Sequence, residues 1–495
     1  MGCFSRNHRS CFKTSARIGV ALGIAFLATP MSALAQEDAG GDSPARTKSL
    51  RFEPAIDVSQ EYTTNVDLTP DGQEDSAFVT RVTPSLRFRA STARLEAAVD
   101  GSPTFRYQSA GDDEGSNIDY ALSGLANAEL AREHLFVESR ASVSQQVLSS
   151  SQSASASNQK TVQSYRLSPY VQTRLGSALK AELRYSLDQV FVSSGDVSDQ
   201  TTHAGSVSVA SGNTFQRLDW VGLARVEESE RSDDDNISRA DVELAAGYEI
   251  DQSVQLLAAT GYQSFDDGDS TDFDSPIMQG GIRYRPGPRT LFELTYGLRD
   301  DRYSPNLTLR QEIGARTKLF LNYNEELGTA QDRLSGMLSF IGVDGETDAF
   351  VDSRFGTPFN PKPDPFDIGN DTSRIKTFSA TLVGDWNRNS IIASSRYARE
   401  TKQGIDIDED SLRADVVWSR RATRKLTVRG SAGYERTEFD DGQDDDEILI
   451  NAGLQYRLWR QALFNLSYTF QTQSSDDPAS EYDSHGVMVG LRIQM

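Results

Sequence analysis

The sequence predicts an all-β protein: a single transmembrane, antiparallel, up-and-down β-barrel of about 22 strands, within a range of roughly 18 to 24. Three observations predict this fold. Apolar and polar residues alternate along many segments, tight turns alternate with long polar connections, and aromatic residues stand at both ends of the apolar stripe. An N-terminal export signal fits the same interpretation.

Residues 1–35 have the three parts of a cleaved secretory signal peptide. Four basic residues and no acid precede an apolar run, residues 18–28, that is too short to span a bilayer as a helix. Ala33-Leu34-Ala35 then has the small-x-small form of a cleavage site. We expect the mature chain to begin at Gln36, with residues 36–49 as a short periplasmic segment. Both cysteines, Cys3 and Cys11, lie in the part that is removed.

The net charge limits the classes of partner that the protein can bind. The formal net charge is −22, which argues against nucleic acid or an anionic lipid surface as a partner. After Gln36 there is no apolar stretch near eighteen residues, so a helical membrane span is excluded. The mean hydropathy of −0.50 does not exclude a barrel, because lipid-facing residues occupy only alternate positions of each strand.

Period-two alternation locates the strands, since successive side chains of a strand point to opposite faces. In residues 50–62 the even positions, such as Leu50 and Phe52, are mainly apolar, whereas the odd ones include Arg51 and Glu53. Residues 179–188 and 239–250 show the same pattern. Applied along residues 50–495, it predicts strands that begin near residues 50, 77, 93, 119, 135, 161, 179, 201, 214, 238, 254, 275, 290, 305, 317, 376, 390, 411, 425, 447, 461 and 484.

The connections between these strands alternate in length. Tight turns at residues 91–92, 133–134, 176–177 and 251–252 alternate with longer polar loops such as residues 63–77 and 149–160, and only the connection around Asp301 is shorter than expected. Outer-membrane barrels place short turns and both termini in the periplasm. We therefore expect a Gram-negative outer-membrane location with periplasmic termini.

A secreted sandwich or solenoid would also show alternation and turns. Two features argue against it. Tyrosines end the apolar stripe of outgoing strands (Tyr185, Tyr262, Tyr296, Tyr434 and Tyr468) and of returning strands (Tyr248, Tyr284 and Tyr456), which predicts two aromatic girdles. The opposite face is too charged to pack against another sheet, and a wet lumen accounts for it.

The polar face supplies the candidate pore lining. Its candidate residues are Arg81, Arg87, Arg94, Arg106, Glu182, Arg184, Arg283, Glu293, Arg299 and Arg429. Mixed charges of this kind screen solutes by charge and hydrogen bonding in a channel. They are also expected of a ladder of ion pairs that fills and stiffens a barrel, and the sequence leaves both interpretations open.

Residues 327–375 form the one connection too long for a turn. They begin with an amphipathic piece and end with four prolines, Pro358, Pro361, Pro363 and Pro365. A long segment with apolar residues of its own is usually functional or disordered. Here it is either a constriction that folds into the lumen or a surface loop packed over the rim.

Acidic clusters mark the long loops and attract divalent cations weakly. The candidate ligands are Asp266, Asp269, Asp272, Asp441, Asp444 and Asp446, but their spacing does not match an EF-hand, and a solvated surface is the default interpretation. We expect no cofactor. We expect no enzyme either, because His134, His203 and His485 lie in no recognisable catalytic motif.

Several passages carry a family resemblance. They are residues 82–99, 135–146 and 165–170, together with Leu338-Ser-Phe-Ile-Gly-Val-Asp344 and Gly356-Thr-Pro-Phe-Asn-Pro361. Together they resemble the outer-membrane proteins associated with the PEP-CTERM and exosortase system, large porin-like barrels found beside exopolysaccharide biosynthesis genes. The resemblance covers most of the mature chain, and its motifs are strand fragments without a catalytic signature.

This resemblance implies an outer-membrane channel that takes part in exopolysaccharide export. The alternative is a non-conducting surface or structural barrel that binds a partner or assists cell-surface assembly. The implied partners are outer-membrane lipid and lipopolysaccharide, the barrel assembly machinery, and polysaccharide or export-system proteins. A TonB-dependent receptor is disfavoured, because only residues 36–49 precede the first strand and leave no room for a plug domain.

Overall fold

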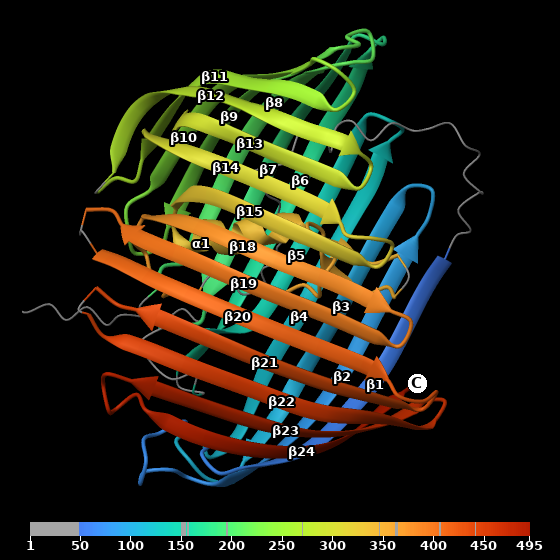
Figure 1. The fold of residues 1–495 in the computed structure, drawn as a ribbon, viewed down its shortest axis with the longest axis vertical. Coiled ribbons are helices and arrows are strands. Elements are labelled where there is room, and N and C mark those ends of the chain that lie inside the picture. Colours follow the sequence, from blue (N-terminus) through green and yellow to red (C-terminus); the bar gives the residue numbers. More distant parts are fainter. Residues whose placement is uncertain are drawn as a thin grey trace, which may run out of the picture.

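The computed structural model describes residues 49–149, 155, 158–194, 197–269, 271–345, 347–361, 365–404, 407–440 and 442–495. In it, 22 antiparallel strands form one closed barrel, as the sequence predicts (Figure 1). The predicted signal peptide and all but the last residue of the segment 36–49 lie outside the described residues. Within the described residues, no helix is long and apolar enough to cross a membrane.

The wall consists of long strands joined in chain order. Their bounds are β1 (Ser49–Thr63), β2 (Ala77–Ser91), β3 (Leu95–Gln108), β4 (Gly115–Ala131), β5 (Leu135–Val147), β6 (Gln159–Leu175), β7 (Leu179–Val192), β8 (Gln200–Ser211), β9 (Leu218–Arg231), β10 (Ile237–Glu249), β11 (Val254–Asp266), β12 (Asp272–Gly287), β13 (Thr290–Arg299), β14 (Arg302–Glu312), β15 (Thr317–Gly328), β18 (Ser373–Trp386), β19 (Asn389–Lys402), β20 (Ile407–Arg421), β21 (Leu426–Glu438), β22 (Asp444–Trp459), β23 (Ala462–Ser475) and β24 (Tyr482–Gln494).

The connection between β15 and β18 holds four short elements. They are α1 (Ala330–Met337), the 3₁₀ helix η2 (Leu338–Phe340), β16 (Ile341–Val343) and β17 (Phe350–Asp352). β15 nevertheless pairs directly with β18, with Gly328 opposite Ser373. The wall closes where β1 meets β24, with Ala55 opposite Gln494. Because the barrel is closed, the wall has no edge strand. A sheet in a membrane must be closed in this way, since unpaired backbone groups of an edge would face hydrocarbon.

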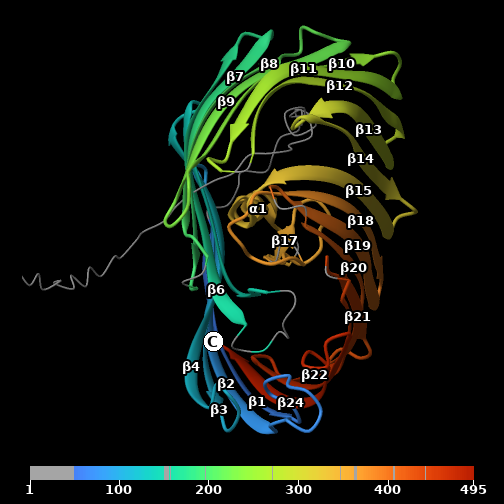
Figure 2. The ribbon, with the colours of Figure 1, turned by 90° about the vertical axis from the view of Figure 1, so that its left-hand side faces the viewer.

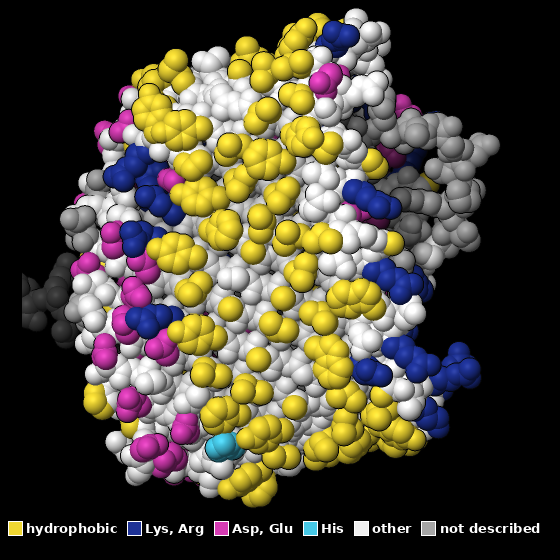
Figure 3. Space-filling model, viewed as in Figure 1, with side chains coloured by type: hydrophobic (Ala, Val, Ile, Leu, Met, Phe, Trp, Pro, Cys, Tyr) yellow, Lys and Arg dark blue, Asp and Glu magenta, His cyan; other side chains and the backbone are white. Residues whose placement is uncertain are grey.

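Each strand has a lipid side and a lumen side. On β10 and β11 the pairs Val242 and Tyr262, and Tyr248 and Leu256, point outward, and their side chains are largely exposed. Figure 3 shows these outward side chains as a broad apolar band across the middle of the barrel. The alternate positions, such as Arg239 and Asp241, face the lumen. The period-two pattern in the sequence therefore separates hydrocarbon from water, as predicted.

The predicted aromatic girdles are confirmed. All eight predicted tyrosines belong to the outward set and are between 37% and 58% exposed. The four tryptophans lie at one end of the barrel only. Near the short turns are Trp220, Trp386, Trp418 and Trp459. Aromatic rings of this kind sit at the boundary between hydrocarbon and headgroups.

The two ends of the barrel differ as the connection lengths predict. The short turns follow the even-numbered strands from β2 to β14 and then β18, β20 and β22, and this end also holds Ser49 and Met495. The unexpectedly short connection on the other side is Asp300-Asp301, where both residues have positive φ, 50° and 58°. Two successive positive φ values are typical of a type I′ hairpin turn, so a loop is unnecessary there.

The predicted strand starts agree closely with the structure, and the differences lie mainly at polar ends. β4 begins at Gly115 rather than near 119, and β20 begins at Ile407 rather than near 411. The hydrogen-bonded ladder continues beyond the apolar band, where alternation is no longer enforced by lipid. Alternation therefore marks the membrane-spanning part of a strand better than its end.

Candidate functional site: the barrel lumen

Residues 329–372, called the inner segment below, fold into the barrel. Figure 2 looks along the barrel and places α1 and β17 inside the ring of strands. Contacts agree with the view, because α1 lies against β6 and β7, η2 against β5 and β6, and β16 against β4. The candidate constriction segment, predicted as residues 327–375, thus lies in the lumen apart from its ends, which belong to β15 and β18. It also reaches other strands, because Arg333 pairs with Glu400 on β19 at 3.4 Å and Phe355 packs against Phe320 on β15.

The helix α1 has a well-defined start. The Thr329 hydroxyl accepts a hydrogen bond from the N–H of Asp332 at 3.2 Å, and the Asp332 carboxylate accepts one from the N–H of Thr329 at 3.1 Å. This reciprocal capping box satisfies two donors that the first turn of a helix otherwise leaves unpaired. The Asp332 carboxylate also accepts a hydrogen bond from Gln200 on β8, at 2.7 Å. The cap therefore fixes the helix to the wall.

Apolar contact holds α1 against the wall. Ala330 and Leu334 pack with Val162, Val190 and Val192, which point into the lumen from β6 and β7. Val190 is 1% exposed. Burial of a valine or leucine side chain contributes about 1.5–3 kcal/mol. This small core accounts for the choice of wall, because the remaining inward positions of β6 and β7 are mostly polar.

Arg140 on β5 holds the chain after α1. Its guanidinium donates to the backbone carbonyls of Leu338, Ser339 and Ile341, at 2.7, 2.6 and 3.3 Å. The same side chain pairs with Glu138 at 2.7 Å. One planar cation thus satisfies three carbonyls of a short irregular stretch, and this lets η2 leave the helical hydrogen-bond pattern without orphan acceptors.

A buried ion pair lies beside this stretch. Arg166 on β6 donates twice to the carboxylate of Asp188 on β7, and its third contact is the Ser339 hydroxyl at 3.1 Å. Arg166 is 2% exposed and Asp188 is 5% exposed. A bidentate pair satisfies both charges in this dry place. The wall and the inner segment therefore share one polar contact surface.

The inner segment extends through most of the barrel. Asp348 forms an ion pair with Arg51 at 2.8 Å, and its carbonyl accepts hydrogen bonds from Arg89. Arg51 lies near the start of β1 and Arg89 near the end of β2, so both belong to the short-turn end. The ring of Phe350 lies 5.1 Å from the Arg89 guanidinium. The segment thus enters at the long-loop end and reaches the opposite one.

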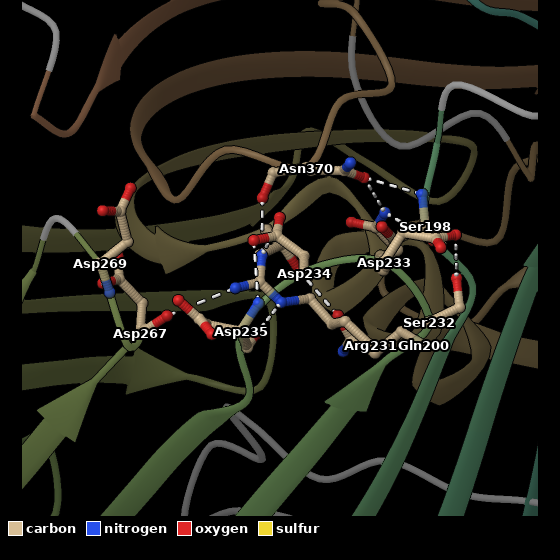
Figure 4. A network of polar contacts seen from close by, with 12 residues as sticks. Ser198, Gln200, Arg231, Ser232, Asp233, Asp234, Asp235, Asp267, Asp269 and Asn370 are labelled. Atoms are coloured by element: carbon tan, nitrogen blue, oxygen red, sulfur yellow. Dashed lines mark hydrogen bonds and ion pairs between the residues drawn. The ribbon is translucent and has the colours of Figure 1, made fainter. Parts of the chain in front are cut away.

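Two arginines hold the chain at the long loops, one by contacting β15 just before the inner segment and one by contacting the segment near its end. Arg239 on β10 donates to the carbonyl of Leu327 at 2.8 Å. Arg231 at the end of β9 donates to the carbonyl of Asn370 at 3.0 Å and to the Asp234 carboxylate at 3.0 Å (Figure 4). Figure 4 shows this network, in which loops β7–β8, β9–β10 and β11–β12 surround Asn370. Both entry points are therefore fixed.

The wall across the lumen from β6 and β7 remains wet. Arg413 on β20 and Arg429 on β21 point inward and are exposed, whereas Ser168 on β6 points inward and is 0% exposed. Arg413 pairs with Asp415 at 2.8 Å and with Glu435 at 3.1 Å. Much of the lumen side of β6 and β7 is thus buried, whereas on β20 and β21 charged groups such as Arg413 stay in contact with water and the buried positions, such as Ser411 and Thr437, lie near the long loops.

A polar cavity of about 630 Å³ lies at the long-loop end, lined by residues of β1 to β6, β23 and β24 and of the loops beside them. Amides, hydroxyls and paired charges line it, among them Gln108, Asn117, Thr469 and Gln471. Arg106 reaches Asp113 at 3.2 Å within this lining. A cavity of this size with few apolar groups suits hydrated, hydrogen-bonding solutes better than apolar ones.

The predicted pore-lining residues lie as follows. Arg81, Arg87, Arg106, Glu182, Arg184, Arg283, Glu293, Arg299 and Arg429 belong to the inward set of their strands. Most are in ion pairs, such as Arg283 with Glu293 at 2.7 Å and Arg184 with Glu182 at 2.7 Å. Arg94 is different, because β3 begins at Leu95 and Arg94 lies exposed in the turn before it. It belongs to the rim.

The predicted acidic ligands do not form a metal site among the described residues, where no group of three or more His, Cys, Asp or Glu side chains is placed to hold a metal ion. Asp266 lies opposite Asp272 on β11 and β12, and Asp269 lies in the loop between them. Asp444 is paired with Arg436 at 2.5 Å. Asp441 lies outside the described residues.

Arg140 and Arg166 are not among the site residues predicted from the sequence. In the alternating pattern of the strands, both arginines occupy positions like those of the other lumen-facing bases. A signal was present in the valines, because Val162, Val190 and Val192 occupy inward positions where polar residues are expected. Apolar residues on the wet face indicate that another part of the chain covers them.

Comparisons with known proteins give one partial family match. A family model described as "Putative beta-barrel porin 2" matches residues 381–495, from the middle of β18 to the end of the chain. No curated protein matches the sequence. The closed wall and apolar exterior are those of an outer-membrane β-barrel, and its C-terminal part is similar to a family of barrel porins.

Solved structures with similar folds have low sequence identity. The siderophore receptor PirA from Acinetobacter baumannii is 8% identical, with 91% of this chain and 81% of that chain covered and a TM-score of 0.49. PirA from Pseudomonas aeruginosa is 10% identical over the same shares, with a TM-score of 0.45. OmpT, an outer membrane protein of Vibrio cholerae, is 9% identical over 92% of this chain and 100% of that chain, with a TM-score of 0.30.

Proposed function

We propose that the protein is a porin-like channel through the outer membrane, narrowed by the inner segment. One observation carries the proposal: Ser164, Ser168 and Asp188 on the lumen side of β6 and β7 are buried, whereas Arg413 and Arg429 on the lumen side of β20 and β21 stay exposed to water. A barrel of 22 strands is too wide for side chains alone to fill. A wet path beside a fixed constriction is the arrangement of a size-limited pore.

The lining favours hydrated polar solutes. Bases and acids alternate along the wet wall, as in the group of Arg413, Asp415 and Glu435, and the cavity at the long-loop end is lined by amides and hydroxyls. Such a surface exchanges hydrogen bonds with a passing polyhydroxylated molecule without trapping it. Export of an exopolysaccharide is the finer form of the proposal, and it rests on the family resemblance.

The proposed orientation places the short turns and both termini in the periplasm. Ser49 and Met495 lie at the short-turn end, and short turns are periplasmic in barrels of this class. The long loops and the entry points of the inner segment then face the outside of the cell. A protease added to intact cells tests this, because it should cut the long loops and spare an epitope tag placed after Met495.

We propose no catalytic role. Two of the three histidines in the described residues face lipid, where His203 pairs with the Tyr185 hydroxyl at 2.7 Å and His485 with that of Tyr468 at 2.8 Å. The third, His134, lies in a short turn and contacts the Gln172 carbonyl. Histidines on the outer face and in a turn do not converge on a lumen nucleophile.

Single-channel recording of the refolded mature protein in a planar bilayer tests the channel. We expect stable openings from the native chain and larger ones after residues 330–371 are replaced by a short Gly-Ser turn. Shortening the β23–β24 loop at residues 476–480 is the matched control and should leave the conductance unchanged. Silence from native protein shown to be folded and inserted would contradict the proposal.

The second candidate is a non-conducting barrel that binds a partner. The observation in its favour is the anchoring of the inner segment at both ends of the barrel, by Arg231 at the long loops and by Arg51 at the short turns. It predicts no current from the native chain, and current only after the inner segment is removed. The same recordings therefore separate the two functions.

A further inference from the structure

The short-turn rim carries a dense basic patch on one side of the barrel. It occupies four neighbouring turns, β14–β15, β18–β19, β20–β21 and β22–β23, and appears in Figure 3 as the dark blue groups along the right-hand edge. The residues of this basic rim are Arg316, Lys318, Arg388, Arg420, Arg421, Arg424, Lys425, Arg457 and Arg460, all of them exposed.

The basic rim lacks counter-charges of its own. Only two acids, Glu312 and Asp385, occur in these four turns, and none of the nine bases forms an ion pair with a carboxylate of the described residues. Two of them instead donate to Asn387, Arg316 to its side chain and Arg421 to its carbonyl. Towards the long loops most described arginines have a carboxylate partner, such as Arg399 with Asp410 and Arg436 with Asp444, so the shortage of counter-charges belongs to the short-turn end.

The opposite end has the reverse sign. Outward-facing charges beside the long loops are mainly carboxylates, such as Asp408 and Asp274, and the arginines there are paired, as Arg399 is with Asp410. Figure 3 shows the acidic groups along the left-hand edge. The net charge of −22 therefore conceals two rims of opposite charge.

The height of the basic rim identifies what it meets. It continues directly from the apolar band, and Trp386, Trp418 and Trp459 mark the boundary, with Arg388, Arg420 and Arg460 one or two residues further along. Interfacial tryptophans sit at the level of lipid headgroups. Guanidinium groups at that level match phosphate oxygens in charge and in bidentate geometry.

We propose that the basic rim binds the headgroups of anionic glycerophospholipids in the leaflet on the short-turn side. The net charge of the chain, which argues against an anionic lipid surface, does not decide the charge felt at this rim, because the attraction of a headgroup decays within about 10 Å at 0.1 M salt. Lys318, Arg421 and Arg457 occupy lumen-facing positions of their strands. A headgroup at this rim therefore senses mainly the other six bases, Arg316, Arg388, Arg420, Arg424, Lys425 and Arg460, rather than the distant acidic loops. The proposal depends on the transmembrane fold and not on conduction.

Spin-labelled lipids test the proposal with the full mature chain. The protein is reconstituted in phosphatidylcholine vesicles that contain trace spin-labelled phosphatidylglycerol or phosphatidylcholine, and the motionally restricted fraction gives their relative association constant. We expect phosphatidylglycerol to be preferred by roughly twofold or more, because each base near a surface adds attraction. The preference should fall towards one in 1 M salt, where the Debye length is about 3 Å.

Two matched variants locate the site. The first carries Arg388→Gln, Arg420→Gln, Arg424→Gln and Arg460→Gln, and it should lose the preference. The second removes four charges from the other side of the same rim, by Arg94→Gln, Arg132→Gln, Arg174→Gln and Arg217→Gln, and it should keep most of it. All eight side chains are exposed near turns, and heat-modifiable migration in gels verifies that each barrel is folded.

Three results would overturn the proposal. They are a native protein without preference for phosphatidylglycerol, a first variant that keeps the preference, and a second variant that loses as much as the first. The first result would leave an acidic macromolecule as the occupant of the rim. Equal losses in the two variants would show that the total charge of the rim attracts lipid and that the four turns form no specific headgroup site.

Discussion

Replacing Arg140 by methionine should release the inner segment from the wall while leaving the barrel closed. Methionine keeps much of the length and apolar volume of the side chain and removes all of its donors. The carbonyls of Ser339 and Ile341 then lose the Arg140 donor, and that of Leu338 keeps only the N–H of Ile341. Each strand of the wall keeps its ladder, so the effect is confined to the segment.

The expected magnitude follows from the three contacts. A hydrogen bond to a charged group contributes about 1.5–3 kcal/mol, and three bonds from one guanidinium are not additive. The Arg140 side chain is 21% exposed and stays paired with Glu138 in the native protein. We therefore assign about 3 kcal/mol to the anchor, which corresponds to an increase on the order of 100-fold in the population with the segment detached.

Thiol labelling measures that population. The only cysteines, Cys3 and Cys11, lie in the predicted signal peptide, so Leu338→Cys supplies a single reporter in the mature chain, at a position that is 0% exposed. Its labelling should accelerate on the order of 100-fold when Arg140→Met is added. Arg413→Met, on the wet wall, is the control and should not change the rate. A rate within about twofold of the reference after Arg140→Met would refute the role of Arg140.

Three further changes have defined outcomes. Thr329→Ala removes the capping box of α1, costs about 1 kcal/mol and should accelerate the same labelling roughly fivefold. Asp188→Ala leaves the buried Arg166 without its carboxylate, and we expect a loss of about 3–5 kcal/mol, seen as a lower urea midpoint for unfolding. In the turn before β11, hydrogen bonds from the Ser253 hydroxyl and N–H lower the pKa of Asp251, so this turn loses stabilisation as the pH falls through that pKa. Ser253→Ala should raise the pKa of Asp251 towards 3.8, which NMR titration of the carboxyl carbon would measure.

The wall was predictable because lipid and water impose a strict pattern on it. Outward positions within the apolar band are mainly apolar, so residues such as Val242, Leu244 and Ala246 reveal both the strand and its face. Strand ends were less predictable, since outside the band both faces meet water. Arg94 illustrates this, because it continues the alternation of the strand but lies in a turn.

The inner segment was less predictable, for a different reason. Its length and apolar residues showed that it is special, but its place depends on Arg140, which is 198 residues from Leu338 in the chain. Such a contact leaves no periodic pattern. The inward valines Val162 and Val190 were the one local indication of where the segment packs. This indication can be used only when the lumen-facing side of each strand is known.

Charge was the third limit. The formal net charge of the chain, −22, does not reveal how the charges are distributed, because it adds a basic rim and an acidic rim together. Assigning each charged residue to a turn or a loop, as the strand pattern already allowed, would have separated the two rims without a structure.

The seam between β1 and β24 constrains the order of folding. Ala55 faces Gln494, so this pairing closes almost the whole described chain into one loop, at an entropic cost of about 5 kcal/mol. Neighbouring hairpins form locally and cheaply by comparison. The inner segment precedes β18 in the chain and packs on β6 and β7, which precede it. It can therefore dock on a half-built, open sheet, and the last seven strands, β18 to β24, then enclose it before the seam forms. An assembly that closed the seam first would have to thread 44 residues into a finished cylinder.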